Sequence, residues 1–477
     1  MKPPARRGRI RERLAAAAHP VEVVGQTIER TLDPLTAVLK RAALRRAERD
    51  SRQFEEPAPE PVAPPAPRSR VSPLAVPFPE MPPTPGVELA SAYAGLRRRQ
   101  KDDVVLMRFA PGTACAGVFT RHAVAAAPVE WCRRHLEASG GEVRALVVNA
   151  GCANSMAGKA GTDAARRVAA AAAKRLGVRQ REVMLASTGP MGGALDDAKL
   201  TGKLPQLEQR LAPASWEDAA RAIMSTDTFP KGACATAEVE GRTVRIAGIA
   251  KGSGMVAPDM ATVLAFIATD AAINASALQT LAGLYVRSTF NSVTVDGDAS
   301  TNDCCLLFAT GASGAPKITR AGDKRLVDFR EKLEQVMFEL ALQVVRDGEG
   351  ASKLIKVGVT GAANPASARK IARAIATSVG VRAALSGGEP NWSRVVAAAG
   401  QADEPLRREH LSLRFGGVTV LAEGAITGGY VDEALRDYLG GREIEVGLDA
   451  GVGPSRAVVW TCDLTPRYVE LNQGMRG

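Results

Sequence analysis

A threonine at the end of a glycine-rich stretch is the first residue whose setting suggests chemistry. Residues 251–262 read Lys-Gly-Ser-Gly-Met-Val-Ala-Pro-Asp-Met-Ala-Thr, and the apolar run 263–267 follows. Glycine and proline keep the first part out of regular structure, whereas the apolar run is typical of a buried strand or helix start. Thr262 therefore lies where a loop enters the core, and its hydroxyl is a candidate nucleophile. Its own α-amino group would serve as the base if the Ala261–Thr262 bond were cut.

Thr262 also has a purely structural interpretation, since a β-branched residue after a glycine-rich turn is an ordinary strand start. The rest of the chain offers little material for other nucleophilic mechanisms. None of its four histidines lies in a glycine-rich or polar motif; they are His19, His122, His135 and His410. An N-terminal nucleophile needs no histidine, so this scarcity favours the catalytic interpretation.

Four motifs, one of them the start of this stretch, occur along the chain in a specific order. They are Ser-Thr-Gly at 187–189, Lys-Gly-Ser-Gly-Met at 251–255, Asp-Gly-Glu-Gly at 347–350 and Pro-Asn-Trp at 390–392. With Met-Ala-Thr at 260–262, they make residues 86–472 resemble the ornithine acetyltransferases, also called glutamate N-acetyltransferases, of arginine biosynthesis. In that family an Ala–Thr bond breaks autocatalytically, and the new N-terminal threonine carries an acetyl group.

The resemblance implies a layered α/β fold in which helices flank β-sheets, related to that of self-cleaving aminopeptidases. Cleavage at Ala261–Thr262 would divide the body into an α chain and a β chain, assembled as α2β2. The expected activity is a ping-pong transfer of an acetyl group from N-acetylornithine to glutamate through a Thr262 acyl-enzyme. We expect no metal and no bound cofactor, although some family members also accept acetyl-CoA as a co-substrate.

The resemblance also assigns roles to individual residues. Thr188 Oγ and the Gly189 N–H would form the oxyanion hole, because an acyl transfer passes through a tetrahedral oxyanion that preorganised donors stabilise. Beside Thr262, the substrate contacts would come from Ser225, Thr226, Lys251, Glu349 and Asn472. A fixed cation such as Lys251 suits a substrate carboxylate, and the glutamate suits an amino group. Turns and exposed loops are the alternative setting for all of these residues.

Several positions depart from the family pattern, among them Gln473-Gly474 in place of Ala-Asp. Asp259 stands where asparagine is familiar, and Pro190 stands where an aliphatic residue is usual. The final residue, Gly477, occupies the place of a threonine or serine whose hydroxyl touches the substrate in the family. This missing hydroxyl predicts weak binding of N-acetylornithine, or a preference for a related N-acyl amino acid.

A block of carboxylates lies between residues 291 and 303, with Asp296, Asp298 and Asp303 as its acids. Such a block suggests a metal-binding loop, but its spacing does not match that of an EF-hand. We therefore favour turn-building and hydrogen bonding as its role.

Apolar runs and helical patterns predict most of the elements that must position these residues, and the family resemblance implies the two strands at 86–90 and 116–120. We expect strands at 86–90, 116–120, 143–148, 183–186 and 263–267, and a strand pair that turns at 240–242. We expect helices at 161–176, 275–286, 322–346 and 370–376, and one that ends near 139–141.

Composition sets two N-terminal segments apart from the body, and the family resemblance divides the body itself into two chains. Residues 1–50 carry twelve Lys or Arg and six acids and read as a basic helical extension with helices at 10–18 and 21–50. Residues 51–85 hold twelve of the 29 prolines, which is typical of a disordered, semi-extended linker. The acetyltransferase body then comprises an α chain, 86–261, and a β chain, 262–477.

Bulk composition excludes several classes of protein. The net charge of +11 lies largely in residues 1–50, so the body is only mildly basic and we expect no nucleic-acid partner. No apolar run reaches the ~20 residues of a membrane helix, and no secretory signal is visible. Seven scattered cysteines without a C-x-x-C pair suit a reducing compartment, which favours the cytoplasm.

Two other functions remain open at this point. Water in place of glutamate as the acceptor would make the chain a self-cleaving amidohydrolase or aminopeptidase of the same fold. Alternatively, residues 1–50 could act as a scaffold or membrane-associated binding element attached to a relict body. Thr-Gly and Ala-Thr in this local context favour the transferase over the hydrolase, and the intact nucleophile and oxyanion motifs argue against the scaffold.

Overall fold

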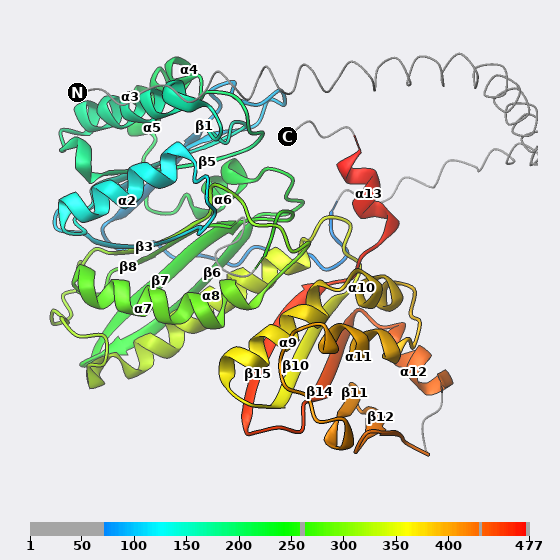
Figure 1. Ribbon diagram of the computed structural model, residues 1–477. Helices are drawn as coiled ribbons and strands as arrows, with labels where there is room; N and C mark the ends of the chain where they lie inside the picture. Colours follow the sequence, from blue (N-terminus) through cyan, green and yellow to red (C-terminus); the bar gives the residue numbers. More distant parts are fainter. Residues whose placement is uncertain (1–70, 258–262, 429–431, 474–477) are drawn as a thin grey trace, which may run out of the picture. The chain divides into compact units, whose positions relative to one another are not determined.

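The computed structural model describes residues 71–257, 263–428 and 432–473 (Figure 1). The chain divides into two units, Met1–Arg68 and Ser69–Gly477, and every described residue belongs to the second. The predicted helices at 10–18 and 21–50 lie outside the described residues, as do Ala261, Thr262 and Gly477. Within the described ranges, no helix combines the length and the apolar character that a membrane crossing requires.

Two β-sheets form the centre of the body. The four-stranded sheet has the order β1-β2-β4-β5, with β1 (Val87–Ala92), β2 (Val104–Phe109), β4 (Ala145–Ala150) and β5 (Val183–Thr188). The five-stranded sheet has the order β3-β9-β8-β7-β6, with β3 (Ala114–Phe119), β6 (Lys231–Val239), β7 (Arg242–Lys251), β8 (Leu264–Thr269) and β9 (Cys304–Ala309). Strands from both sides of Thr262 therefore pair within one sheet, since β7 lies beside β8.

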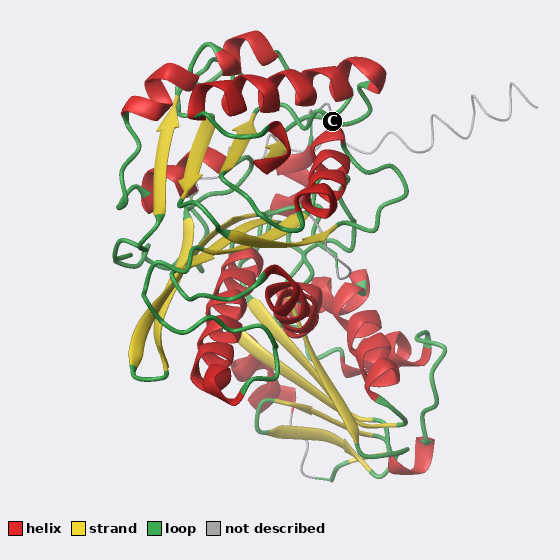
Figure 2. Ribbon diagram, turned by 90° about the vertical axis from the view of Figure 1, so that its left-hand side faces the viewer, coloured by secondary structure: helices red, strands yellow, loops and turns green. Residues whose placement is uncertain are grey.

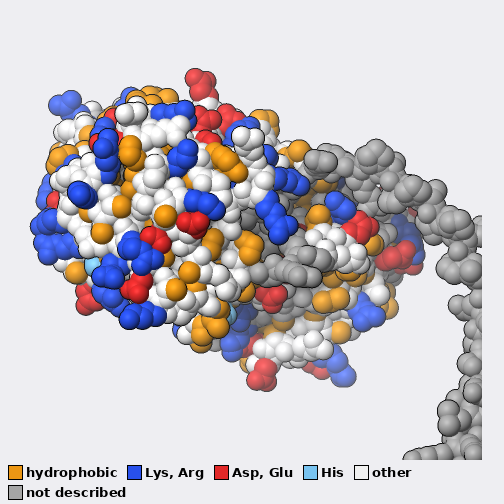
Figure 3. Space-filling view, turned by 90° about the horizontal axis from the view of Figure 1, so that it is seen from above, with side chains coloured by type: hydrophobic (Ala, Val, Ile, Leu, Met, Phe, Trp, Pro, Cys, Tyr) orange, Lys and Arg blue, Asp and Glu red, His pale blue; other side chains and the backbone are white. Residues whose placement is uncertain are grey.

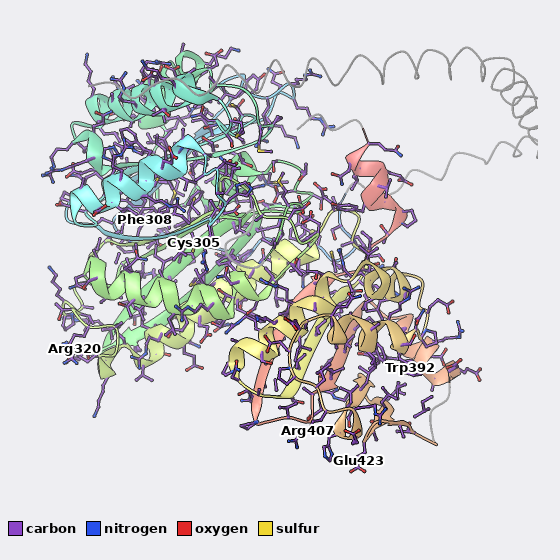
Figure 4. The ribbon with its side chains drawn as sticks, viewed as in Figure 1. Cys305, Phe308, Arg320, Trp392, Arg407 and Glu423 are labelled. Carbon is purple, nitrogen blue, oxygen red and sulfur yellow. The ribbon has the colours of Figure 1, made fainter. Side chains whose placement is uncertain are left out.

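Strands β8 and β9 of the five-stranded sheet are buried on both faces, which explains their continuous apolar runs. Leu264 and Phe266 of β8 face a core that they share with the four-stranded sheet, whereas Ile267 belongs to a second core on the other face. Phe308 and Cys305 of β9 likewise belong to opposite cores (Figure 4). Phe308 stacks on Phe109 of β2 with ring centroids 4.2 Å apart, so the two sheets pack face to face.

Helices cover the outer faces of the two sheets (Figures 1 and 2). The core of the four-stranded sheet includes residues of α2 (Ala127–Ser139), α3 (Gly158–Leu176), α4 (Asp197–Thr201), α5 (Leu204–Gln209) and α6 (Trp216–Ile223). The second core lies under α7 (Ala275–Ser288) and α8 (Val327–Arg346). Small alanines on the buried side of α3 allow close packing on the sheet, and the helix ends at Gly177, whose φ of +64° suits glycine. The result is the predicted layered α/β fold.

The last part of the chain builds a separate core around a six-stranded sheet of order β13-β12-β11-β14-β10-β15. Its strands are β10 (Leu354–Ala362), β11 (Ser412–Phe415), β12 (Val418–Ala422), β13 (Ala425–Ile426), β14 (Glu443–Asp449) and β15 (Ser455–Cys462). Its helices are α9 (Pro365–Thr377), α10 (Val379–Ser386), α11 (Trp392–Gly400) and α12 (Asp432–Leu439). Trp392 of the Pro-Asn-Trp motif begins α11 and packs against this core (Figure 4), and α13 (Pro466–Asn472) follows the sheet.

The segment 71–85 corrects the predicted linker. Leu74 and Met81 are buried in the two cores of the body, and Thr84 is 1% exposed. Ser72 donates a hydrogen bond of 2.5 Å to the Arg346 carbonyl. The prediction of a linker as far as residue 85 is therefore wrong for residues 71–85, because apolar side chains between the prolines pack against the sheets.

Neither the charged side chains on the face seen in Figure 3 nor the cysteines suggest a particular function. On the face seen in Figure 3, Lys and Arg side chains are spread among apolar and uncharged ones. All seven cysteines are free, and five of them are buried. Their interpretation as small apolar residues holds for those five; Cys152 and Cys234 are partly exposed.

Candidate active site

Strand pairing places Lys251 beside the predicted nucleophile segment. Lys251 is the last residue of β7, and its partner in the antiparallel register is Leu264, the first residue of β8. Leu264 follows Thr262 by two positions in the chain. The Lys251 side chain is 3% exposed. A buried cation therefore lies next to the strand that Thr262 precedes.

Both flanks of residues 258–262 are held by one loop, residues 294–304, here called the carboxylate loop. On the N-terminal side, Asp296 accepts hydrogen bonds from the Met255 and Val256 N–H groups at 2.6 and 2.8 Å. On the C-terminal side, Asp303 Oδ1 accepts a hydrogen bond of 3.1 Å from the Val263 N–H. The hydrogen-bonding role predicted for these carboxylates is confirmed for Asp296 and Asp303, because they bind the backbone at both ends of the segment.

The Thr188–Gly189 turn follows β5 and has free donors. Among the described residues, neither the Thr188 hydroxyl nor the Gly189 N–H donates a hydrogen bond. Gly189 has a φ of +133°, and a Cβ atom there would lie 2.6 Å from the Cys152 backbone nitrogen. Only glycine fits this turn, because an L side chain would be both strained and in collision.

The carboxylate loop also reaches the Thr188–Gly189 turn. Asn302 Nδ2 donates to the Ser187 carbonyl at 3.0 Å and to the Ala153 carbonyl at 2.7 Å. Asn302 precedes Asp303, which binds the Val263 N–H. One loop therefore sets the position of the oxyanion candidates relative to the strand that Thr262 precedes.

The substrate-binding candidates meet around Ser253. The Thr226 and Ser253 hydroxyl oxygens lie 2.7 Å apart, and the Glu349 N–H donates to the Ser253 carbonyl at 2.8 Å. Asn472 Nδ2 donates to Glu349 Oε2 at 3.0 Å. The Glu349 carboxylate lies directly over Gly254, where a Cβ atom would come within 2.7 Å of it. The structure thus brings Thr226, Glu349 and Asn472 together, from segments far apart in the sequence.

Four charged side chains lie buried beneath these residues, here called the buried ion network (Asp227, Lys231, Lys251 and Asp347). Lys231 Nζ lies 2.7 Å from Asp227 Oδ1 and 2.6 Å from Asp347 Oδ2. Asp227 Oδ2 lies 3.8 Å from Lys251 Nζ. Two carboxylates and two ammonium groups balance in charge, which buried ions require.

Comparisons with known proteins identify relatives of this chain by sequence. The ArgJ family profile matches residues 88–476 of this chain. A Caulobacter vibrioides protein named arginine biosynthesis bifunctional protein ArgJ is 60% identical over 402 residues, which cover 84% of this chain and 100% of that protein. A Brucella suis protein of the same name is 48% identical over 410 residues, which cover 85% of this chain and 99% of that protein.

The chain belongs to the ArgJ family. The family identified from the motifs is thereby confirmed, and so is the assignment to the acyltransferases of arginine biosynthesis. Solved structures in the comparison include ArgJ from Bacillus halodurans, 34% identical, with a TM-score of 0.42 over 43% of this chain and 96% of that chain. Another is ornithine acetyltransferase complexed with ornithine from Mycobacterium tuberculosis, 29% identical, with a TM-score of 0.33 over 41% of this chain and 98% of that chain.

Burial shifts the pKa values of the charged groups in this ArgJ-family site. It lowers the pKa of the Lys251 ammonium, and the nearby Asp227 carboxylate partly opposes that effect. Burial also raises the pKa of the Asp303 carboxyl well above its usual range, against the opposing charge of Lys251. Burial would raise the pKa of Asp227 as well, but Lys231 and Lys251 outweigh it, so that this pKa is lowered. Of these three residues, Asp227 is the one whose pKa shift favours its ionised form.

The site contains buried charged residues that received no role from the sequence, namely Asp227, Lys231 and Asp347. In sequence they are ordinary charged residues beside turns. The only signal was their closeness in the chain to residues with assigned roles, since Asp227 follows Thr226 and Asp347 precedes Glu349 by two positions. Within the described ranges, no group of three or more His, Cys, Asp or Glu side chains is arranged to hold a metal ion.

Proposed function

We propose that this chain transfers an acetyl group from N-acetylornithine to glutamate, through an acyl-enzyme on Thr262 that forms after self-cleavage of the Ala261–Thr262 bond. One observation carries the proposal. The carboxylate loop binds the backbone on both flanks of residues 258–262 and also binds the Ser187 carbonyl, next to the Thr188–Gly189 turn. The flanks of the nucleophile segment and the oxyanion turn thus share one support, which favours the fixed relative position of nucleophile and donors that acyl transfer requires.

In the first half-reaction the Thr262 hydroxyl attacks the acetyl carbonyl of N-acetylornithine, and the Thr262 α-amino group takes the hydroxyl proton. The Thr188 hydroxyl and the Gly189 N–H donate hydrogen bonds to the oxyanion. The carbon–nitrogen bond then breaks, and the proton passes to the departing amine of ornithine. In the second half-reaction the amino group of glutamate attacks the acyl-enzyme, which yields N-acetylglutamate and restores the Thr262 hydroxyl.

The amino-acid part of either substrate meets charged and polar groups. The Lys251 ammonium binds the carboxylate, and Glu349 binds the amino group. Ser225, Thr226 and Asn472 supply further hydrogen bonds. Acetyl-CoA is a possible co-substrate in place of N-acetylornithine, and the reaction uses no resident cofactor or metal.

The cleaved chains stay together in this proposal, because β6 and β7 precede Thr262 and pair in one sheet with β8 and β9, which follow it. The α chain ends at Ala261, the β chain begins at Thr262, and the assembly is α2β2 in the cytoplasm. The basic helical extension predicted at 1–50 lies outside the described residues, and the linker prediction is kept only for residues before Val71. The chain has no nucleic-acid partner.

An acetyl-transfer assay tests this function. Purified protein should convert N-acetylornithine and glutamate to ornithine and N-acetylglutamate, and should release little acetate when glutamate is omitted. Thr262→Ala should abolish the transfer. Rapid acetate release without glutamate would instead indicate a hydrolase of the same fold, and transfer to an amino acid other than glutamate would indicate a different acceptor.

A further inference from the structure

The Asp227 carboxylate lies between two lysines of the buried ion network, and only one of these, Lys251, has a role in the proposed reaction. We propose that Asp227 is a positioning residue that fixes the place and the charge of the Lys251 ammonium group for the carboxylate of the amino-acid substrate. The inference rests on the proposed function, because that function supplies the substrate carboxylate. Asp227 acts through Lys251 and does not itself touch the substrate.

Lys251 needs such a partner because it is buried and weakly held. Its side chain is 3% exposed, and Asp227 Oδ2, at 3.8 Å, is its ion-pair partner among the described residues. Lysine carries three N–H donors, and at 3.8 Å none of them makes a short hydrogen bond to Asp227. Asp227 therefore balances the charge of Lys251 without taking the donors that a substrate carboxylate requires.

Asp227 is itself held rigidly by other groups. Its Oδ1 atom accepts hydrogen bonds of 2.7 Å from Lys231 Nζ and 2.7 Å from the Gly252 N–H. Its Oδ2 atom accepts a hydrogen bond of 2.8 Å from the Ser225 N–H. One carboxylate thus joins the loop of the substrate hydroxyls to the backbone directly after Lys251.

Lys231 and Asp347 complete the buried ion network, because Lys231 pairs with both Asp227 and Asp347. Both Lys231 and Asp347 have fully buried side chains. Asp347 accepts a hydrogen bond of 2.9 Å from the Thr228 N–H, and it lies two residues before Glu349. Because Asp347 contacts Lys231 and not Lys251, it offers a matched comparison within the same network.

The charges that face Lys251 come from three places in the fold. They are Asp227 and Lys231 near the start of β6, Asp303 at the end of the carboxylate loop, and Glu349 after α8. Burial lowers the pKa of Lys251 most strongly, Asp227 opposes this more than any other group, and Lys231 lowers the pKa further. Loss of the Asp227 charge therefore lowers the pKa of Lys251. Because only protonated Lys251 binds a carboxylate, binding is then lost at a lower pH.

The test compares Asp227→Asn with Asp347→Asn, since each substitution removes one carboxylate from Lys231. The Michaelis constant for glutamate is measured from neutral to alkaline pH. KM should rise at alkaline pH as Lys251 loses its proton. In Asp227→Asn we expect this rise to begin about one pH unit or more lower than in the native protein, so that at a given alkaline pH beyond the rise KM is about tenfold higher than the native value. The effect on kcat should be smaller, because the contact serves ground and transition states alike. In Asp347→Asn the rise should stay near its native pH.

A charge-balanced variant keeps the inference testable if Asp227→Asn does not fold. Lys231→Met combined with Asp347→Asn removes one positive and one negative charge, and replacement of a buried ion pair by neutral groups is often tolerated. Asp227 then faces Lys251 alone, and the alkaline rise of KM should move to higher pH. A rise that stays in place, or moves down, in this variant would overturn the inference.

Failure of the inference is distinguishable from failure of the proposed function. Native protein that cleaves at Thr262 and transfers acetyl to glutamate establishes the function without reference to Asp227. If that protein shows an alkaline rise of KM, and Asp227→Asn folds but leaves the rise unmoved, Asp227 does not set the charge of Lys251 and the inference is overturned.

Discussion

The two halves of the candidate active site are held in place by different kinds of interaction. The acyl half is the Thr188–Gly189 turn, where a glycine φ of +133° and close backbone packing direct two free donors. The amino-acid half holds Lys251 and Glu349, and it stands on buried charges that balance one another. Backbone geometry does not titrate, whereas buried charges do. Substitutions in the acyl half should therefore alter turnover, and those in the amino-acid half should alter substrate affinity and its pH dependence.

The largest effect, and one confined to the acyl half, is expected from Thr188→Val. This substitution removes one oxyanion donor and nearly keeps the shape of the side chain. We expect kcat for acetyl transfer to fall by about 10²–10³-fold with little change in KM, because the donor acts mainly in the transition state. Steady-state kinetics with N-acetylornithine and glutamate measure this effect. Thr188→Ser keeps the hydroxyl as the control, and an equal loss in both variants would remove the hydroxyl from the oxyanion hole.

Glu349→Gln probes the opposite half. The substitution keeps the size of the side chain and the acceptor for Asn472, but it removes the negative charge that faces the substrate amino group. A hydrogen bond to a charged group contributes about 1.5–3 kcal/mol, so KM should rise about 10- to 100-fold, with a smaller change in kcat. Glu331→Gln, at an exposed position of α8, is the control. A change in kcat alone would move Glu349 from the amino-acid half to the acyl half.

Two truncations test whether the segment before the first sheet supports the amino-acid half. The Ser72 N–H donates to Thr228 Oγ1 at 2.9 Å, and that hydroxyl in turn donates to Asp347. Removal of residues 1–68 should leave cleavage, transfer and stability unchanged.

Removal of residues 1–85 also deletes the buried Leu74 and Met81, each of which contributes about 1.5–3 kcal/mol. This longer truncation should lower the midpoint of thermal unfolding and raise KM more than it lowers kcat. Equal midpoints for the two truncated proteins, measured by calorimetry, would mean that residues 69–85 add nothing to the body.

The smallest effect is expected from Gly477→Thr. This position lies outside the described residues, and the family resemblance alone motivates the substitution. A regained hydroxyl would contribute about 0.5–1.5 kcal/mol, so KM for N-acetylornithine should fall about two- to tenfold with kcat nearly constant. Identical kinetics for both proteins would show that residue 477 does not contact the substrate.

The sequence predicted the elements whose signals are local. Apolar runs predicted β5 and β8, and helical periodicity predicted α3 and α8, with errors of a few residues at their ends. The family resemblance predicted Thr226, Glu349 and Asn472 as parts of one site, and the structure brings these three together.

Other features depend on contacts that no local pattern encodes. Proline-rich composition is the same for a free linker and for a segment such as 71–85 that packs on the body, so the linker prediction extended too far. The buried ion network joins residues more than one hundred positions apart in the chain, and its members look exposed in sequence. The six-stranded sheet was not predicted strand by strand, because β10 pairs with β14 and β15 across a long separation.

Protein chemistry on the purified chain tests the central claim most directly. Intact mass and N-terminal sequencing should find two fragments, the smaller of which begins at Thr262, and Thr262→Ala should remain a single uncleaved chain. Because both fragments contribute strands to one sheet, they should separate only after denaturation. A native protein that stays a single chain, yet transfers acetyl groups, would contradict the N-terminal threonine mechanism.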